Sequence, residues 1–167
     1  RPEADGLLTS TPRRRLGVPE PDHQRIVQLY FMREEPEGAA ARLTAQSAGD
    51  TELATFAGLV EAEAGALDDV RRMSEINRSF RRLLALSSHN RYLLRSLDQI
   101  SVTLSLLPTL IGVNGRARVL HRQHREIVEA LLRRDGVAAE SLLKARVRAA
   151  QQHRMGIALR SRAGSAG

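Results

Sequence analysis

One histidine interrupts the apolar face of a predicted helix in the second half of the chain. At 3.6 residues per turn, one face of the segment 116–134 collects Leu120, His124, Ile127, Val128 and Leu131. The ordinary interpretation of His124 is a core histidine that hydrogen-bonds to a neighbour. Two other predicted helices carry a comparable interruption, and the polar residue in each is an arginine, Arg81 and Arg146. This recurrence favours a binding site formed by the three side chains.

Arginine inside a helical bundle indicates that an anion is close by. Helical spacing places Arg81 on one face with Leu84, and it places Arg146 on one face with Leu142. Two guanidiniums in an apolar interior are costly unless a bound anion or buried carboxylates neutralise them. These residue types therefore predict either an anion-binding pocket or a set of internal ion pairs.

The sequence carries no recognisable catalytic motif. It contains no cysteine, which excludes disulfides and thiol catalysis. It has no glycine-rich phosphate loop after a strand, no nucleophile elbow and no His-Glu-x-x-His run. His121 and His124 are three residues apart, but their arginine neighbours repel a cation, and we expect His121 to be exposed. We therefore predict that the chain is not an enzyme.

Length and composition are typical of one domain. After removal of irregular ends, the 167 residues leave one domain of about 140 residues. No apolar run approaches the roughly 18 residues of a membrane span, and no signal-peptide pattern is present, so we expect a cytoplasmic protein without membrane contact. The net charge is +7, and every basic residue except Lys144 is an arginine. Most arginines lie beside acidic residues, which indicates a solvated surface rather than a nucleic-acid-binding face.

Hydrophobic periodicity predicts an all-α antiparallel bundle of about six helices. The helices are expected over about 22–45, 50–64, 70–88, 91–107, 116–134 and 137–159. Asp22 and Asp50 are the expected N-caps of the first two helices, and Pro36 is expected to kink or split the first. Asp135-Gly136 is expected to close the fifth helix.

The predicted organisation has three parts. Residues 1–21 contain several prolines and glycines and are expected to form a short hairpin and linker. The helical domain covers 22–160, and 161–167 is expected to be a disordered tail.

Three segments resemble the ligand-binding domain, called the FCD domain, of GntR-type transcription regulators of the FadR subfamily. They are Tyr30–Leu43, which contains Arg33 and Glu37, then Asn77–Asn90, then His124–Gly136. The similarity spans about 22–155. It implies an FCD-like bundle that binds a small effector and forms a homodimer, within a regulator that binds operator DNA.

The start of the chain resembles the end of such a regulator's winged helix-turn-helix. In this resemblance Leu7-Leu8 enters the wing, and Arg13, Arg14 and Arg15 form its DNA-contacting tip. The linker then follows. In this resemblance residues 1–21 match only the end of the DNA-binding domain, and most of that domain is missing. The alternative is that Arg13 to Arg15 form an ordinary basic linker.

The resemblance also implies where a metal would lie. Many members of the subfamily hold a divalent metal with an Asp or Asn and three His. Asn77 and His124 match two of these positions, whereas Arg81 and Arg146 stand where two histidines would be. Because a guanidinium neither deprotonates nor coordinates a metal, we expect no metal or other cofactor. A metal, if present, would use Asn77 and His124.

The predicted effector site is therefore a pocket without metal. Arg33, Arg81 and Arg146 would bind an organic carboxylate or phosphate, and Asn77 and His124 would be hydrogen-bonding partners. The opposing prediction is a dead pocket, in which the arginines reach outward or pair with glutamates such as Glu37.

The predicted function is the effector-binding and dimerisation part of a GntR-type DNA-binding regulator that senses a small organic acid or another anion. One alternative is a fragment deficient in DNA binding that has a dead pocket and acts only by dimerising. Another alternative is a metal-dependent FCD sensor.

Overall fold

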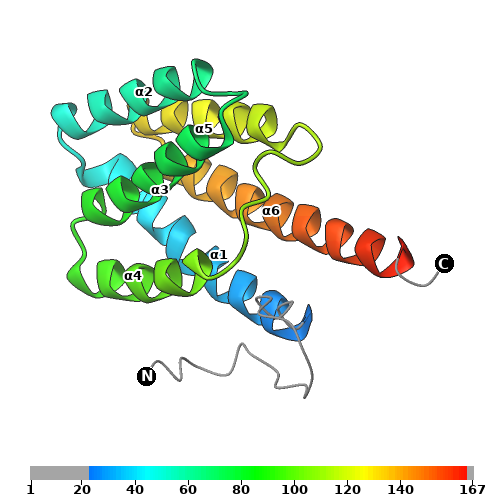
Figure 1. Ribbon diagram of the computed structural model, residues 1–167. Helices are drawn as coiled ribbons and strands as arrows, with labels where there is room; N and C mark the ends of the chain where they lie inside the picture. The colour runs from blue at the N-terminus through cyan, green and yellow to red at the C-terminus, as the bar shows by residue number, and fades with distance from the viewer. Residues whose placement is uncertain (1–22, 165–167) are drawn as a thin grey trace, which may run out of the picture.

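The computed structural model describes residues 23–164, and the regular structure in that range is entirely α-helical (Figure 1). The helices are α1 (His23–Ser47), α2 (Asp50–Ala64), α3 (Val70–Ser87), α4 (Arg91–Ser105), α5 (Arg116–Leu132) and α6 (Gly136–Gly164). This confirms the predicted all-α class. The expected N-terminal hairpin, Asp22 and the arginines at 13–15 lie outside the described residues, as do 165–167. None of the described helices combines the length and apolarity that a bilayer crossing requires.

The two long helices α1 and α6 pack against each other and form the spine of the bundle (Figure 1). Helices α2, α3 and α5 pack at one end of this pair, and α4 packs against α1 and α3. The main core lies between these elements and is built around Phe56 and Phe80, whose rings meet edge to face with centroids 5.2 Å apart. Leu84, Ile127 and Leu143 are also fully buried there.

Pro36 was expected either to kink the first helix or to split it, and the split does not occur, because α1 continues through Pro36. A proline inside a helix removes one backbone hydrogen bond and crowds the preceding turn. Here α1 buries residues on both sides of the proline, including Ile26 and Tyr30 before it and Ala40 and Ala41 after it. Packing along the whole length of α1 therefore outweighs the local cost of Pro36.

Three other helix boundaries differ from the sequence-based expectation. Gly49, not Asp50, is the N-cap of α2, and the Glu52 carboxylate accepts the Gly49 N–H at 2.8 Å. Asp135 serves both helices: its N–H donates to the carbonyl oxygen of Ala130 at 3.0 Å and closes α5 as expected, and its carboxylate accepts the N–H of Ala138 at 2.9 Å and caps α6. Gly136 was expected in the closing turn and is instead the first residue of α6. Helix α6 also extends to Gly164, into the segment expected to be disordered.

Asn90 provides a test of how local capping supports the fold. Its side-chain oxygen accepts the backbone N–H groups of Tyr92 and Leu93, both at 3.1 Å. We expect Asn90→Ala to lower the free energy of unfolding by about 1 kcal/mol, as measured by urea denaturation. The exposed Gln99 on the same helix is the control, and Gln99→Ala is expected to change stability by less than about 0.5 kcal/mol. Equal effects of the two substitutions would contradict the capping role.

Candidate functional site

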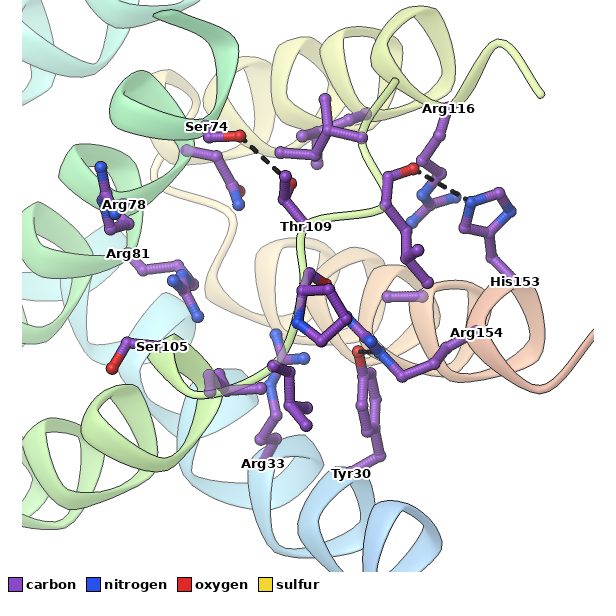
Figure 2. A pocket seen from close by; sticks show the side chains of 18 of the residues that line it. Tyr30, Arg33, Ser74, Arg78, Arg81, Ser105, Thr109, Arg116, His153 and Arg154 are labelled. Carbon is purple, nitrogen blue, oxygen red and sulfur yellow. Dashed lines mark hydrogen bonds between the residues drawn. The ribbon is translucent and has the colours of Figure 1, made fainter. Parts of the chain in front are cut away.

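A cavity of about 190 Å³ lies between α1, α3, α5, α6 and the segment that joins α4 to α5 (Figure 2). Its polar wall is dominated by arginine, and no carboxylate of the described residues lines it. The lining arginines are Arg33, Arg78, Arg81, Arg116, Arg146 and Arg154. Such a lining can attract and hold an anion, and it repels a cation.

Helical periodicity explains why several of the polar side chains point into the cavity. On α3, Ser74 and Arg81 are seven residues apart and Asn77 lies between them, so all three share a face. On α6, Arg146 and His153 are likewise seven residues apart. Helices α3 and α6 therefore each direct a row of polar side chains into the cavity.

A buried carboxylate, Glu37, lies behind the cavity wall and joins two of its arginines. The Nε of Arg33 donates to Oε1 of Glu37 at 2.7 Å, and Nη1 of Arg146 lies 3.5 Å from Oε2. Burial alone would raise the pKa of Glu37, but the charges of Arg33 and Arg146 outweigh it and hold that pKa below its ordinary value. Glu37 is therefore ionised at neutral pH and pairs with both arginines.

This internal pairing leaves positive charge and hydrogen-bond donors unmatched. Arg146 donates to Oδ1 of Asn77 at 2.8 Å, yet its Nε and Nη1 have no hydrogen-bond partner, and neither has the buried Nε of Arg81. Burial lowers the pKa of Arg146, the charge of Glu37 opposes this, the neighbouring guanidiniums add to it, and the net result is a pKa of about 10. Burial also lowers the pKa of Arg81. Because a pKa of about 10 still leaves Arg146 charged at pH 7, the cavity wall carries cations that lack counter-ions.

His124 is buried beside this cavity but does not line it. Its ring stacks on Phe80 with centroids 3.8 Å apart, and its Nδ1 lies 2.5 Å from Oε1 of Glu63. Burial raises the pKa of Glu63 to about 7, and burial followed by the charge of Arg146 lowers the pKa of His124 well below its ordinary value. At mildly acidic pH the protonated Glu63 therefore donates to a neutral imidazole. These contacts fit the core-histidine interpretation of His124.

His121, which was expected to be exposed, is partly buried. Its Nδ1 lies 3.4 Å from Oε2 of Glu63, and 21% of its side chain is exposed. The expectation failed because Glu63 on α2 comes close to the α5 face that carries both histidines.

The residues present do not fit the divalent metal that the resemblance implies. The side-chain oxygen of Asn77 already accepts from Arg146. Glu63 binds Nδ1 of His124 and leaves Nε2 without a hydrogen-bond partner, so His124 offers one ring nitrogen where a metal would need several ligands. Two permanent cations, Arg81 and Arg146, occupy the remaining positions. Within residues 23–160, no group of three or more His, Cys, Asp or Glu side chains could hold a metal ion.

The structure brings together four of the five predicted effector-binding residues, Arg33, Asn77, Arg81 and Arg146, on the cavity lining. Several other lining residues were missed. Ser74 and His153 could have been found, because each lies seven residues from a predicted arginine on the same helix. Arg116 and Arg154 were indistinguishable in the sequence from the many surface arginines.

The segment between α4 and α5 closes one side of the cavity and was also missed. Figure 2 shows it crossing between the arginines of α3 and those of α5 and α6. The hydroxyls of Thr109 and Ser74 lie 3.1 Å apart, and Arg154 donates to the carbonyl oxygen of Pro108 at 3.0 Å. An irregular segment has no periodicity from which such contacts can be predicted.

Comparison with known proteins links this architecture to transcription regulators. The sequence model of the family described as "FCD domain" matches residues 28–149. The chain is 27% identical over 143 residues to the Bacillus subtilis (strain 168) protein named "Uncharacterized HTH-type transcriptional regulator YdhC". That match covers 83% of this chain and 63% of the relative, so the chain spans less than two thirds of the relative's length.

Two solved structures share the fold. The first is a GntR protein of Streptococcus agalactiae, with a TM-score of 0.61, 22% identity and coverage of 78% of this chain and 60% of that one. The second is E. coli McbR/YncC, with a TM-score of 0.69, 20% identity and coverage of 83% and 66%. At these identities the likeness establishes the arrangement of helices and leaves the ligand to be inferred from the cavity itself.

Proposed function

The chain belongs to the FCD-domain family, and from this premise we propose that it binds a small organic anion directly through arginine side chains, as the effector-binding part of a GntR-type transcription regulator. The domain is a regulatory one and not an enzyme. The observation that carries the proposal is a cavity lined by six arginines and no carboxylate of the described residues.

The proposed mode of binding needs no metal. A guanidinium holds a carboxylate or phosphate through two parallel charge-assisted hydrogen bonds. Arg81 and Arg146 supply buried N–H groups that have no hydrogen-bond partner among the described residues, and Arg33 adds a third charge beside them. Glu37 orients Arg33 and Arg146, and Asn77 fixes the other side of Arg146. An anion entering this cavity would therefore meet donors that are already positioned.

The partners of the protein follow from the similarity and are part of the proposal. The relative's name describes an HTH-type transcriptional regulator, which supports operator DNA as the macromolecular target. The homodimer is proposed from membership of the FCD-domain family. An effector acts by binding more tightly to one placement of the two DNA-binding domains than to another. Anion binding in this cavity would shift the regulator toward that placement.

A second candidate is a dead pocket, and the ion pairs of Glu37 are the observation that favours it. In that candidate Glu37 neutralises Arg33 and Arg146, and the domain acts only by dimerising. The two candidates differ in whether a small anion binds at all.

Calorimetry with four small anions, namely acetate, succinate, citrate and inorganic phosphate, separates the candidates. We expect at least one of them to bind and Arg81→Gln to weaken that binding about tenfold, because the substitution removes one charged donor. Arg71 lies on the same helix with 91% of its side chain exposed, so Arg71→Gln controls for the general loss of charge. Absence of binding at millimolar concentration of all four anions would favour the dead pocket.

A further inference from the structure

We propose that the effector carries a phosphate monoester group in its dianionic form, and that Arg81 and Arg146 bind the terminal phosphate oxygens. This inference rests on the proposed function and specifies the class of ligand for the same cavity.

The first support is the balance of charge around the cavity. Arg33, Arg116 and Arg146 are buried, and Arg81 has a buried Nε, whereas Glu37 is the one carboxylate that forms an ion pair with any of them among the described residues. Four guanidiniums therefore face one carboxylate, which is an excess of three positive charges. A monocarboxylate would leave two of these uncompensated, and a dianion would leave one. Uncompensated buried charge is strongly unfavourable, so the wall favours a dianion.

The second support is the number of free donors. Three buried N–H positions have no hydrogen-bond partner, namely Nε of Arg81 and both Nε and Nη1 of Arg146. A terminal phosphate presents three acceptor oxygens, whereas a carboxylate presents two. Figure 2 shows Arg81 on α3 and Arg33 on α1 directed into the same space. The donor set therefore matches a tetrahedral oxyanion better than a planar one.

The third support is the shape and chemistry of the remaining wall. The cavity volume of about 190 Å³ is below the roughly 300–1,000 Å³ of pockets for drug-sized ligands. Apart from the arginines the lining carries no charged side chain of the described residues except the imidazole-bearing His153, and it is a mixture of apolar side chains, chiefly leucines, with the polar side chains of Tyr30, Ser74, Asn77, Ser105 and Thr109. The part of the ligand that carries the phosphate is therefore small and uncharged.

The test compares four probes on the full chain by isothermal calorimetry: inorganic phosphate, sulfate, succinate and acetate. Ionic strength is held constant with chloride, and each titration is run at pH 6 and pH 8. We expect phosphate at pH 8 to bind about tenfold or more tightly than acetate or succinate, because it fills one more charged donor. The affinity for phosphate should be lower at pH 6, where phosphate gains a proton. Sulfate stays dianionic, so its affinity should change much less.

A substitution that keeps the charge separates hydrogen bonding from simple attraction. Arg146→Lys retains a cation but loses the Nε and Nη1 donors, so we expect phosphate to bind about tenfold more weakly to it. Arg71→Lys at the exposed position is the matched control and should leave phosphate affinity unchanged.

The outcomes distinguish this inference from the proposed function. If succinate or acetate binds as tightly as phosphate and sulfate, the phosphate assignment is overturned and the anion-binding function stands. If no probe binds better than chloride, both are overturned. The wild-type comparison alone decides between these outcomes, so it remains informative even if Arg146→Lys fails to fold.

Discussion

Arg146→Met is expected to abolish anion binding while leaving the domain as stable as the wild type or more stable. The guanidinium of Arg146 has two buried nitrogens, Nε and Nη1, without a hydrogen-bond partner among the described residues, and the one ion-pair contact of Nη1, with Glu37, is long at 3.5 Å. The loss of two charged hydrogen bonds corresponds to about 3 kcal/mol, which is roughly a hundredfold in affinity. Stability should not fall in parallel, because Arg146 is one of several guanidiniums close together, and its loss relieves repulsion among them without leaving a buried carboxylate unpaired. Glu37 also keeps Arg33 as its partner at 2.7 Å.

Calorimetry with inorganic phosphate and urea denaturation in chloride buffer measure the two effects separately. Arg148 lies two residues further along α6, pairs with Glu34 and has 58% of its side chain exposed. Arg148→Met should leave anion affinity within about twofold of the wild type, since surface ion pairs contribute little. If Arg146→Met keeps wild-type affinity, Arg146 does not bind the anion.

Glu63→Gln is expected to stabilise the domain at pH 8 by about 3 kcal/mol. The wild type should become less stable as the pH rises and Glu63 ionises, and the variant should not show this loss. Burial raises the pKa of Glu63 from 4.5 to about 7, so the folded state binds this proton more tightly than the unfolded state does. The stabilising contribution of the bound proton is complete below pH 4.5 and is lost as the pH rises through about 7. Each pKa unit corresponds to about 1.4 kcal/mol. The amide introduced by Glu63→Gln would keep a hydrogen bond to His124 without forming a charge.

Urea denaturation at pH 6 and pH 8 measures this effect. The wild type should lose about 1 kcal/mol between these values through Glu63, and the Glu63→Gln variant should not. His124, whose pKa is lowered, acts in the opposite direction: it destabilises the fold below about pH 6.5, so it lowers stability at pH 6 in both proteins and the comparison between them isolates Glu63. Glu61 on α2 is exposed, so Glu61→Gln serves as the control. Identical pH slopes for the wild type and Glu63→Gln would show that Glu63 is ionised in the folded domain throughout this range.

The helical class could be predicted from the sequence because periodicity is a local property of the chain. The apolar positions of α3, α4 and α5 repeat at helical spacing, and each predicted helix appears within a few residues of its expected place. The errors lie where tertiary contacts override local rules. Pro36 is carried inside α1 by packing on both sides, and His121 is partly buried because Glu63 on α2 lies 3.4 Å from its Nδ1.

The polar side of the cavity was partly predictable for the same reason. Arg81 and Arg146 stand on otherwise apolar helix faces, and the structure places both on the lining. His124 stands on such a face too, but its partner Glu63 is 61 positions away in the sequence, and nothing local indicates that pairing. The closing segment around Thr109 is irregular, so its contacts with α3 and α6 depend on the assembled bundle.

The most direct test of anion binding by arginine without a metal is calorimetry on protein that has been passed over an immobilised chelating resin. A resin is preferable to a dissolved chelator such as EDTA, which is itself a polyanion and would compete for the cavity. The protein is titrated with inorganic phosphate and with succinate, before and after addition of Mn²⁺ or Zn²⁺. We predict that metal-depleted wild-type protein binds at least one of these anions, that added metal leaves the affinity unchanged, and that Arg146→Met does not bind. Binding that disappears on the resin and returns with the metal would contradict direct recognition by Arg81 and Arg146.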